Sequence, residues 1–565
     1  MNQRLFAGVL ALTLLAQHGL FAASFDWPQW QGPDRTAHSK ETGLLKEWSK
    51  DGPPLAWKVK GLGGGDSTPS ISAARIYGMS HRGADEVVWA LAENDGKEVW
   101  AVRIAPAQPQ NWPQSKEGPS ATPTVDGDRL YVMGLAGNIV CLQAKDGKVV
   151  WQRNLKSDFG GRSPMWSFRE SPLVDGDKVI CTPGGEEATM VALNKLTGET
   201  IWKSAVSDRA GGSQAPSRAP SGNRPNAIET VPVLSTLDKD QNKEISADEL
   251  AAAPTALPKL DKNQDGKLSE DELSPAREGQ AGGERRRRGP GMMRMVKALS
   301  ALDADESGAI EQSEIKNAVA ALKKLDENSD GKLTDDEVGM KSMSPPNTGA
   351  AYSSAIAIDF GGQRQYVQLL AMTVAGVSAA DGKLLWRYDK PANSMRINIS
   401  TPIYHDGYVF AATAYGAGGG LAKLVKKETG EFTAEEVWFS KSMENHHGGV
   451  ILYDGALFGA NGGNGGGYMA CLDFKTGEVL WNERDSDKRR VTKGSVAFAD
   501  GRIYYRTEEG PIVLIEPSRK EYLERGRFTQ PERTDKPAWA HPVVANGKFY
   551  IRDQDTLFCY DVKVR

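Results

Sequence analysis

The sequence contains little cysteine, almost no excess of charge, and no long apolar run after its first residues. Its 69 basic and 73 acidic side chains give a net charge of −4, and this balance provides no basic field that would attract nucleic acid. No segment beyond residue 23 is apolar over the roughly 20 residues that a membrane-spanning helix needs. We therefore expect neither a nucleic-acid partner nor a stable membrane span.

The first residues have the character of a secretory signal peptide. Arg4 gives a positive start, and Leu5–Ala16 is an apolar run that is short for a membrane helix and is followed by small residues. We predict that residues 1–23 are a signal peptide and that the protein is secreted or periplasmic. The alternative is an uncleaved anchor, which Gln17 and His18 disfavour because they interrupt the apolar run.

Glycine and tryptophan, by contrast, are abundant, with 61 and 14 copies, and they form a repeat. Trp100, Trp151 and Trp202 are 51 residues apart, whereas Trp202 and Trp386 are 184 residues apart. A period of roughly 40–50 residues is typical of solenoids and propellers, and the long interval indicates an insertion of roughly 130 residues. In each copy a glycine precedes the tryptophan by four residues, at Gly96/Trp100, Gly147/Trp151, Gly198/Trp202, Gly382/Trp386 and Gly477/Trp481.

Each repeat predicts two β-hairpins, and two hairpins make one four-stranded blade. One hairpin ends in the tryptophan, and the other has an Asp-Gly or Asn-Gly turn that supplies the positive φ of a tight turn. The predicted fold class is all-β, an eight-bladed β-propeller, with an open solenoid as the competing architecture. The last blade lacks a tryptophan strand, and we predict that 54–59 supplies it and closes the ring. The predicted blades are 67–104, 122–155, 171–205, 352–389, 399–443, 446–484, 493–528 and 538–564.

Four acidic loops of twelve residues lie inside the long interval. Oxygen-bearing side chains stand at positions 1, 3, 5, 9 and 12, with glutamate at position 12, and position 7 offers its carbonyl oxygen. A calcium ion takes about seven oxygen ligands, and this spacing supplies them from a single loop. The loops therefore predict an inserted α-helical EF-hand domain with calcium ligands at Asp238, Asp240, Asn242, Glu244, Ser246 and Glu249; Asp261, Asn263, Asp265, Lys267, Ser269 and Glu272; Asp303, Asp305, Ser307, Ala309, Glu311 and Glu314; and Asp326, Asn328, Asp330, Lys332, Thr334 and Glu337.

The spacing of the loops predicts how they associate. Their first residues are 23 positions apart, from 238 to 261 and from 303 to 326, which predicts two pairs of neighbouring loops. In the first loop, Lys243 replaces the glycine at the sharp turn, at a cost on the order of 1 kcal/mol. The alternative to calcium binding is a relic domain that no longer holds the ion. Each loop carries an aliphatic residue at position 8 through which paired loops pack, namely Ile245, Leu268, Ile310 and Leu333.

Segments rich in glycine, serine, proline and arginine flank the insertion. We interpret them, including Arg285–Arg288, as flexible tethers, because charge runs in such surroundings are usually solvated. The predicted organisation is a signal peptide at 1–23, the first part of the propeller at 24–210, the EF-hand insertion at 211–347, and the second part of the propeller at 348–565.

The cysteines follow the repeat rather than a disulfide pattern. Cys141, Cys471 and Cys559 occupy one repeat position, where other copies have Ala90 and Ala192. Equivalent positions of different blades are far apart in a closed ring, so we predict small buried residues and no disulfide.

The Gly-x-x-x-Trp blades, the opening Trp27–Pro33 and the stretch Asn445–Gly449 resemble the PQQ-like (quinoprotein-type) eight-bladed β-propeller proteins. The resemblance covers residues 27–205 and 350–565. It implies the fold more firmly than an activity. Members include pyrroloquinoline-quinone alcohol dehydrogenases and non-catalytic relatives such as the outer-membrane protein assembly propeller.

Departures from the dehydrogenases favour the non-catalytic relatives. Those enzymes typically carry two adjacent cysteines over the quinone, and no two cysteines are adjacent in this sequence. The Cys-x-x-Cys-His motif of electron-accepting fusions is absent, and no stretch matches their aspartate base with its calcium ligands. We therefore expect calcium as the cofactor and do not favour bound quinone.

The segments that lead into the innermost strands of a propeller converge on one end of its channel. We predict that a small-molecule or metal site, if the propeller has one, lies there; the alternative is that these side chains only hydrogen-bond one another and close the channel. His446 and His447 are predicted to point to opposite faces of a strand. The candidate cofactor-binding residues are Arg169, Glu170, Arg396, Asn398, His446, His447, Lys493 and His541, with Asp66 and Trp539 beside them.

These features predict an exported propeller scaffold that binds calcium through its insertion, recognises an unidentified protein partner, and is not an enzyme. The first alternative is a quinone-dependent alcohol or sugar dehydrogenase. The second is a propeller hydrolase or lyase that uses His446, His447 and Arg396. Because the insertion joins two blades at the end where the candidate site lies, calcium is also expected to change access to that site.

Overall fold

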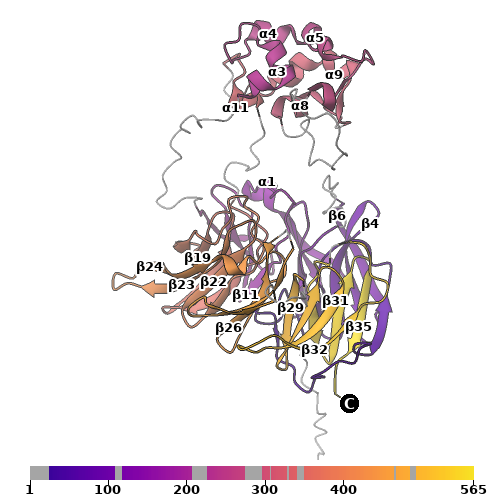
Figure 1. Cartoon of the computed structure of the whole chain (residues 1–565), viewed down its shortest axis with the longest axis vertical. Coiled ribbons are helices and arrows are strands. Elements are labelled where there is room, and N and C mark those ends of the chain that lie inside the picture. The colour runs from indigo at the N-terminus through magenta and orange to yellow at the C-terminus, as the bar shows by residue number, and fades with distance from the viewer. Residues whose placement is uncertain are drawn as a thin grey trace, which may run out of the picture. The chain divides into compact units, whose positions relative to one another are not determined.

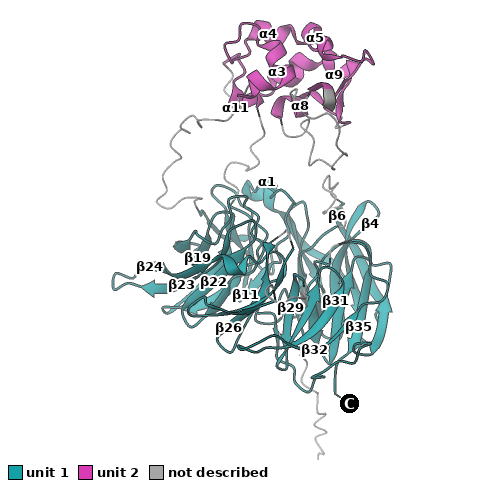
Figure 2. Ribbon diagram, viewed as in Figure 1, with its two compact units in different colours: residues 1–210, 347–565 teal, residues 211–346 magenta. Residues whose placement is uncertain are grey.

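The computed structural model describes residues 25–564, except 108–117, 207–225, 274–295, 306, 327–329, 340–348, 464–465, 484–491 and 537. The predicted signal peptide, the tethers and Asn328 lie outside the described residues. The chain forms two compact units, Met1–Ala210 with Asn347–Arg565, and Gly211–Pro346 (Figure 2). Among the described residues, no helix combines the length and apolar character that a membrane crossing requires.

The larger unit is an eight-bladed β-propeller of four-stranded antiparallel blades (Figure 1). The first three blades precede the insertion. They are β3 (Ser70–Ser72), β4 (Arg75–Arg82), β5 (Asp85–Ala92) and β6 (Glu98–Pro106); β7 (Thr124–Asp126), β8 (Arg129–Met133), β9 (Asn138–Gln143) and β10 (Val149–Asn154); and β11 (Leu173–Asp175), β12 (Lys178–Cys181), β13 (Met190–Asn194) and β14 (Thr200–Ser204).

Four further blades follow the insertion in sequence. They are β17 (Ile356–Phe360), β18 (Gln363–Leu369), β19 (Val374–Ser378) and β20 (Leu384–Tyr388); β21 (Ile403–His405), β22 (Tyr408–Thr413), β23 (Gly418–Lys426) and β24 (Phe432–Ser440); β25 (Val450–Tyr453), β26 (Ala456–Asn461), β27 (Tyr468–Asp473) and β28 (Val479–Asn482); and β29 (Gly494–Ala499), β30 (Arg502–Thr507), β31 (Pro511–Glu516) and β32 (Leu523–Thr529).

The eighth blade is completed by the N-terminal part of the chain, as the sequence predicts. Strand β2 (Leu55–Val59) pairs antiparallel with β35 (Thr556–Asp561), which continues through β34 (Lys548–Asp553) to β33 (Val543–Ala545). The N-terminal and C-terminal parts of the chain therefore share one blade, and this pairing closes the ring. One short strand was not predicted: β1 (His38–Ser39) adds to β29 in parallel.

Neighbouring blades share buried apolar cores, and tryptophans tie them together. Trp100 of β6 donates its indole N–H to the carbonyl of Ala144 in the second blade, at 3.1 Å. Trp151 makes the corresponding bond to Lys195 in the third blade, at 2.9 Å. The cysteines lie in these cores, unpaired and buried, as predicted.

The segment between residues 27 and 39 crosses the centre of the propeller and contacts several blades. The carbonyl of Pro28 accepts a hydrogen bond from Val125 of the second blade at 2.8 Å. Trp30 donates to Thr401 Oγ1 at 2.8 Å, and Ala37 accepts from Phe498 at 2.8 Å. Arg35, only 4% exposed, donates to the carbonyls of Ser171, Pro172 and Ala355. The innermost strands thus converge on a segment that fills part of the channel.

The inserted unit is helical and consists of two halves, each with two acidic loops. The first half contains α2 (Ala227–Thr230), α3 (Pro232–Leu237), α4 (Ala247–Ala251), α5 (Ala253–Ala256), η2 (Leu257–Leu260), β15 (Leu268–Ser269) and α6 (Glu270–Leu273). The second contains α8 (Lys297–Leu302), β16 (Ala309–Ile310), α9 (Gln312–Lys316), α10 (Ala318–Lys323) and α11 (Asp335–Val338). The propeller adds two short helices, α1 (Leu155–Phe159) and η3 (Lys441–Met443).

The predicted pairing of neighbouring loops is wrong. Leu268 of the second loop pairs with Ile310 of the third, and Ile245 of the first pairs with Leu333 of the fourth. The position-8 residues are therefore the pairing residues, but their partners lie in the other half. The physical reason is that Ile245 and Leu268 stand at opposite ends of the helical segment formed by α4, α5 and η2, so they cannot meet.

Candidate functional site

In the four acidic loops, the first and last carboxylates are held in place by the backbone of the loop. Asp238 accepts hydrogen bonds from the amides of Asn242 and Lys243, both at 3.1 Å. Glu249 accepts from the amide of Lys239 at 2.7 Å and from that of Ser246 at 2.9 Å. These bonds fold position 12 back over position 1, which is the arrangement that an oxygen-ligated cation requires.

The other loops repeat this pattern. Gly266 donates to Asp261 at 2.9 Å, and Gly308 donates to Asp303 at 3.1 Å. Hydrogen bonds from the amide and hydroxyl of Ser269 lower the pKa of Glu272 to about 2. Within the described residues, two groups of carboxylates have ligand atoms within 4.8 Å of one another, Asp238, Asp240 and Glu249 in the first loop and Asp303, Asp305 and Glu314 in the third.

Lys243, at the glycine position of the first loop, adopts the left-handed conformation with φ of 69°. The equivalent Gly266, Gly308 and Gly331 have φ between 82° and 86°. The lysine therefore adopts the turn that the cation loop demands, at the backbone cost expected from the sequence. Its ammonium group lies 3.0 Å from Glu229.

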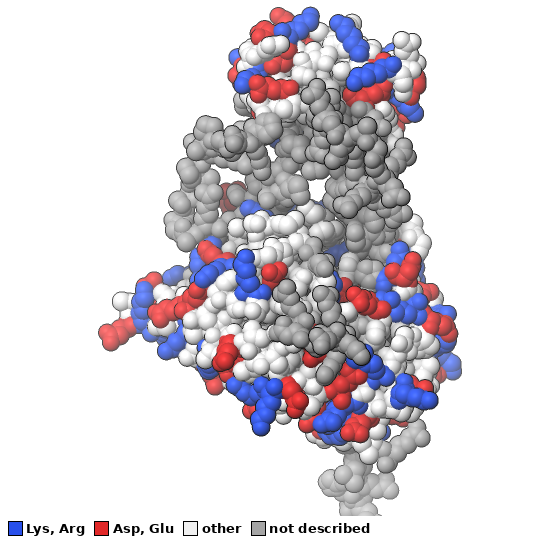
Figure 3. Space-filling model, viewed as in Figure 1, with Lys and Arg blue, Asp and Glu red and all other residues white. Residues whose placement is uncertain are grey.

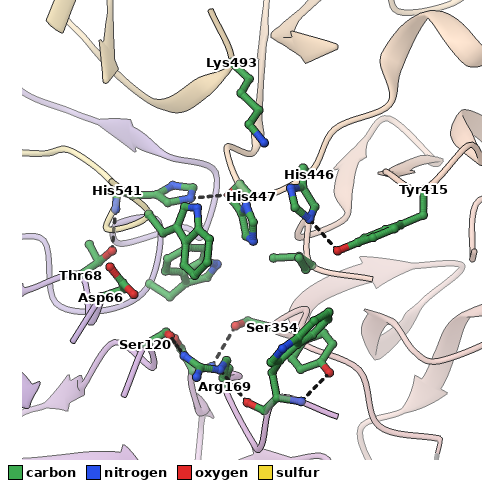
Figure 4. A pocket seen from close by; sticks show the side chains of 16 residues that line it. Asp66, Thr68, Ser120, Arg169, Ser354, Tyr415, His446, His447, Lys493 and His541 are labelled. Carbon is green, nitrogen blue, oxygen red and sulfur yellow. Dashed lines mark hydrogen bonds between the residues drawn. The ribbon is translucent and has the colours of Figure 1, made fainter. Parts of the chain in front are cut away.

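A second candidate site is a cavity of about 450 Å³ in the propeller. It lies where the segments leading into the innermost strands meet the central segment (Figure 4). Aromatic rings, two cations and several hydroxyls line it: Trp30, Asp66, Thr68, Ser120, Trp166, Arg169, Ser171, Tyr352, Ser354, Ile399, Tyr415, His446, His447, Lys493, Trp539 and His541.

Five of the eight candidate cofactor-binding residues line this cavity, namely Arg169, His446, His447, Lys493 and His541. The other three are not among its lining residues. Glu170 is buried and accepts hydrogen bonds from Thr182 and Gln368. Asn398 donates to the carbonyls of Leu370 and Ala371 at 2.7 and 2.9 Å, and Arg396 has a left-handed backbone with φ of 61°. Glu170 and Asn398 thus hold blade connections together.

The expectation that His446 and His447 point to opposite faces is wrong. Both lie in the loop before β25 rather than in a strand, and their ring centroids are 3.7 Å apart. His447 also stacks on Trp539 at 4.6 Å, and the Nε2 of His446 lies 3.1 Å from the Tyr415 hydroxyl. The result is a continuous row of rings, with His541, His447, His446 and Tyr415 in line in Figure 4.

Burial lowers the pKa of all three histidines of the cavity and so favours their uncharged form. Burial lowers the pKa of His541 to about 4. Burial also lowers the pKa of His446 far below its ordinary value, and His447 and Lys493 add to this effect. The pKa of His447 is lowered by burial although Glu508 opposes the shift.

Charged partners surround His447. Its Nδ1 lies 3.6 Å from Glu508 Oε1, and the other oxygen of Glu508 lies 3.4 Å from the Lys493 ammonium. The carboxylate of Glu508 thus lies beside one ring nitrogen of His447, where it can fix the orientation of the imidazole.

Arg169 forms the other side of the cavity. Its guanidinium donates to the carbonyl of Trp166 at 2.7 Å and to that of Gly118 at 3.3 Å, and it also donates to the Ser120 hydroxyl. Trp166 in turn donates its backbone N–H to the Tyr352 hydroxyl at 3.1 Å. Figure 4 shows Arg169 and Ser120 across the cavity from the row of rings.

Sequence reasoning missed Trp30, Tyr352 and Tyr415 because they come from other parts of the chain. Trp30 belongs to the central segment, Tyr352 follows the insertion, and Tyr415 lies in the turn between β22 and β23. A signal existed for the hydroxyls, since Ser or Thr recurs before the innermost strands, as at Thr68, Ser120, Ser171 and Ser354.

The cavity does not fit the quinone centre that the sequence resemblance implies. Among the described residues that line it there is no cysteine and one carboxylate, Asp66, which accepts a hydrogen bond from Gln554 at 3.0 Å. Among the described residues, the carboxylate groups suited to a cation lie in the insertion instead. The residues that line the cavity are therefore not the set that a bound quinone requires.

Two protein-family models match the sequence. A family model described as outer membrane protein assembly factor BamB matches residues 37–258, 341–483 and 465–563. A model described as EF hand matches residues 258–274, which contain the second acidic loop.

Curated relatives match shorter stretches. Outer membrane protein assembly factor BamB of Escherichia coli is 28% identical over 165 residues, which is 28% of this chain and 38% of the relative. Polyvinylalcohol dehydrogenase of a Pseudomonas species is 32% identical over 101 residues, 18% of this chain and 15% of that protein. Quinoprotein ethanol dehydrogenase of Pseudomonas aeruginosa is 29% identical over 111 residues, 20% of this chain and 18% of that protein. The matches thus span well under half of each relative.

Among solved structures, BamB from Moraxella catarrhalis aligns with 90% of this chain and 98% of its own, at 12% identity and a TM-score of 0.46. Quinohemoprotein alcohol dehydrogenase from Comamonas testosteroni aligns with 96% and 81%, at 14% identity and a TM-score of 0.42.

Proposed function

Because this chain belongs to the family described as outer membrane protein assembly factor BamB, we propose that it is an exported propeller scaffold that binds calcium through its insertion and recognises a protein partner. The signal-like start of the sequence supports export to the periplasm or the outside of the cell. The residues that would hold calcium are those of the four acidic loops.

The observation that carries the calcium part is the convergence of positions 1, 3 and 12. In two loops these carboxylates approach within 4.8 Å, although like charges repel one another at such distances. A divalent cation removes that repulsion and uses oxygens that the loop already directs inward. The backbone bonds to Asp261 and Glu272 support the same role for the second loop.

The scaffold part rests on family membership and on the surface of the propeller. Relatives named as assembly factors support a role in recognising other proteins. Basic and acidic side chains are interspersed over the visible face of the propeller (Figure 3). Such a mixed surface suits a specific protein partner better than a polyanion, which a single-sign field would attract.

Calcium titration by calorimetry tests this function. We expect saturable binding at more than one site, and Glu249→Gln, Glu272→Gln and Glu314→Gln each to remove one site. Glu431→Gln is the matched control, because Glu431 is an exposed residue of the propeller that pairs with Lys427 at 3.0 Å. Absence of saturable binding, or stoichiometry unchanged by all three variants, would overturn the calcium role.

Quinone titration tests the dehydrogenase alternative. The relatives named polyvinylalcohol dehydrogenase and quinoprotein ethanol dehydrogenase favour making this test, and the poor fit of the cavity predicts no binding. Saturable quinone binding with dye-linked oxidation of an alcohol would replace the scaffold by an enzyme.

A further inference from the structure

The first and last helices of the inserted unit lie against each other. The amide of Ala227, at the start of α2, donates to Asp335 Oδ1 of α11 at 2.6 Å. A Cβ added to Gly339, which follows α11, would stand 3.3 Å from the Cβ of Ala227. Ala227, Asp335 and Gly339 thus form a junction at which the chain enters and leaves the described part of this unit. The junction joins segments that are 108 residues apart in the sequence.

The first and fourth acidic loops pair beside these helices. Ile245 of the first loop and Leu333 of the fourth exchange both of their backbone hydrogen bonds, each at 2.9 Å. The ammonium of Lys243 in the first loop lies 3.0 Å from Glu229 of α2, and α11 begins directly after Thr334 of the fourth loop. One loop of the pair therefore contacts α2, and the other leads into α11.

A cation in the fourth loop would act on the junction directly. In a loop of this type, the ligands at positions 7 and 9 stand on either side of the pairing residue at position 8, and a glutamate at position 12 supplies two oxygens. In the fourth loop, Lys332 and Thr334 stand on either side of Leu333. Glu337 is the position-12 residue and belongs to α11. An ion held by these groups fixes α11 and, through Asp335, the start of α2.

The pairing also links the first and fourth loops to each other. Because Ile245 and Leu333 share their hydrogen bonds, an ion that orders the backbone of one loop favours the bound form of the other, and this coupling acts equally in both directions. Glu244 and Lys332, at position 7 of the two loops, add an ion pair at 2.8 Å, which is exposed and contributes little. Occupancy of the first loop is therefore expected to depend on the fourth loop rather than on the second, its neighbour in sequence.

The second and third loops form the other pair, through Leu268 with Ile310 and Ser269 with Ala309. A cation is indicated here as well, because Asp303 Oδ1, at position 1 of the third loop, is buried without a hydrogen-bond partner among the described residues. In the part of the unit that the structure describes, the hydrogen bonds of this pair reach neither α2 nor α11. The second and third loops therefore offer the same ligand chemistry without the junction.

We propose that calcium governs the junction through the first and fourth loops, and that the second and third loops have no part in this control. With calcium in the first and fourth loops, α2 and α11 are held together, and loss of that calcium lets the junction open. The inference rests on the proposed calcium binding and adds a regulatory role to it. The two chain segments that lead from this unit to the propeller start from one point when the junction is closed and from two points when it is open.

Hydrogen–deuterium exchange of the full chain, read by mass spectrometry with calcium and with a chelator, tests the proposal. Exchange reports how often a hydrogen-bonded segment opens. We expect calcium to slow the exchange of residues 227–231 about tenfold, a common size for coupling between two sites. Glu337→Gln, at position 12 of the fourth loop, is expected to abolish this slowing together with the slowing in residues 239–246 of the first loop.

Glu272→Gln is the matched comparison, because it makes the same change at position 12 of the second loop. We expect it to remove the calcium effect on exchange in the second and third loops. Residues 227–231 are expected to be slowed by calcium in this variant as much as in the native protein. Coupling between neighbours in sequence would give the opposite result, a loss of the calcium effect in residues 239–246 of the first loop.

Asp335→Ala addresses the junction itself, since Asp335 accepts the hydrogen bond from Ala227 and is not one of the proposed calcium ligands. It is expected to keep the calcium stoichiometry and to remove the calcium effect on residues 227–231. Gln312→Ala is the control, because Gln312 is exposed and stands at the same position of the third loop. It is expected to change neither quantity.

Two exchange results would overturn the proposal. One is that calcium slows residues 227–231 equally in Glu337→Gln and in the native protein, and the other is that Glu272→Gln removes this slowing as completely as Glu337→Gln. Calorimetry on the same samples separates these results from a failure of the proposed function. Bound calcium with an unaffected junction removes this inference alone, whereas absence of bound calcium removes both. If Asp335→Ala does not fold, the comparison of the two glutamate variants still decides.

Discussion

The ring of Trp100 lies directly against Gly147 of the next blade. A Cβ added to Gly147 would stand 2.7 Å from the ring of Trp100, and the glycine has a φ of +74°. The same contact joins Trp151 to Gly198 and Trp202 to Gly382. The glycine and tryptophan of one repeat therefore serve two different interfaces: the glycine receives the ring of the preceding blade, and the tryptophan reaches the following one.

This contact predicts a specific loss of stability for Gly147→Ala. Placing alanine in the left-handed region costs about 1 kcal/mol, and crowding against the indole adds about 1–3 kcal/mol. We expect a total decrease in the free energy of unfolding of about 3 kcal/mol, measured by urea denaturation. Gly127→Ala is the control, because Gly127 has a φ of +60° and nothing within 4 Å of an added Cβ. Equal losses for the two variants would contradict the packing argument.

The propeller was predictable from the repeat. Most of its tryptophans pack against the following blade, several of them on the glycine of the next repeat. One exception is Trp386. Its indole donates to Gln365 within its own blade, at 2.8 Å, and packs on Gly376. A single sequence does not reveal this, because the local motif is unchanged while the neighbouring blade differs.

The cavity was predictable only in part, for a related reason. His446, His447 and His541 lie in segments whose position follows from the repeat. Tyr352 and Trp30 reach the same cavity from segments outside the repeat, so spacing gave no indication of them. The prediction of loop pairing was wrong for a similar reason. Spacing along the chain did not reveal that loops of the two halves pair with each other, as Leu268 does with Ile310.

Arg35 is predicted to be essential for the centre of the propeller. Burial lowers its pKa to about 9, and its side chain satisfies carbonyls of the third and fourth blades. Replacement by methionine keeps the volume but leaves these carbonyls without a donor, so we expect a loss of about 3 kcal/mol or more. Arg364→Met is the control: Arg364 is 40% exposed with ion pairs to Asp175 and Asp359, and such pairs contribute about 0–1 kcal/mol. Thermal and denaturant unfolding measure both, and a similar small loss in the two variants would refute the role.

Replacing Lys243 by glycine is predicted to strengthen calcium binding by the first loop. Lys243→Gly removes the strain of a side chain at φ of 69°, although the freer unfolded chain offsets part of the gain. We expect the inserted unit to gain about 0.5–1 kcal/mol and the first loop to bind calcium more tightly, as measured by calorimetry. Gly266→Lys in the second loop is the reciprocal change and should weaken that loop. Unchanged calcium affinity in either the Lys243→Gly or the Gly266→Lys variant would contradict the backbone argument.

Glu86, which is not among the lining residues of the cavity, predicts a dependence of stability on pH. Burial raises the pKa of this carboxyl to about 7, even though the amide of Leu135 and the charge of Arg169 oppose the shift. The folded protein therefore retains the proton at pH values where the unfolded chain has lost it, so this group stabilises the fold below about pH 4.5 and its contribution is lost as the pH rises towards 7. The full change is on the order of 3 kcal/mol.

Comparing the native protein with Glu86→Gln across this range measures the effect. Glutamine keeps an acceptor for the Leu135 amide, which lies 3.1 Å from the carboxylate, but it cannot ionise. We expect the variant to match the native protein near pH 4.5 and to exceed its free energy of unfolding above pH 7, because only the native side chain must then carry a buried charge. A difference between the two proteins that stays constant from pH 4.5 to 8 would show that the carboxyl titrates normally in the folded state.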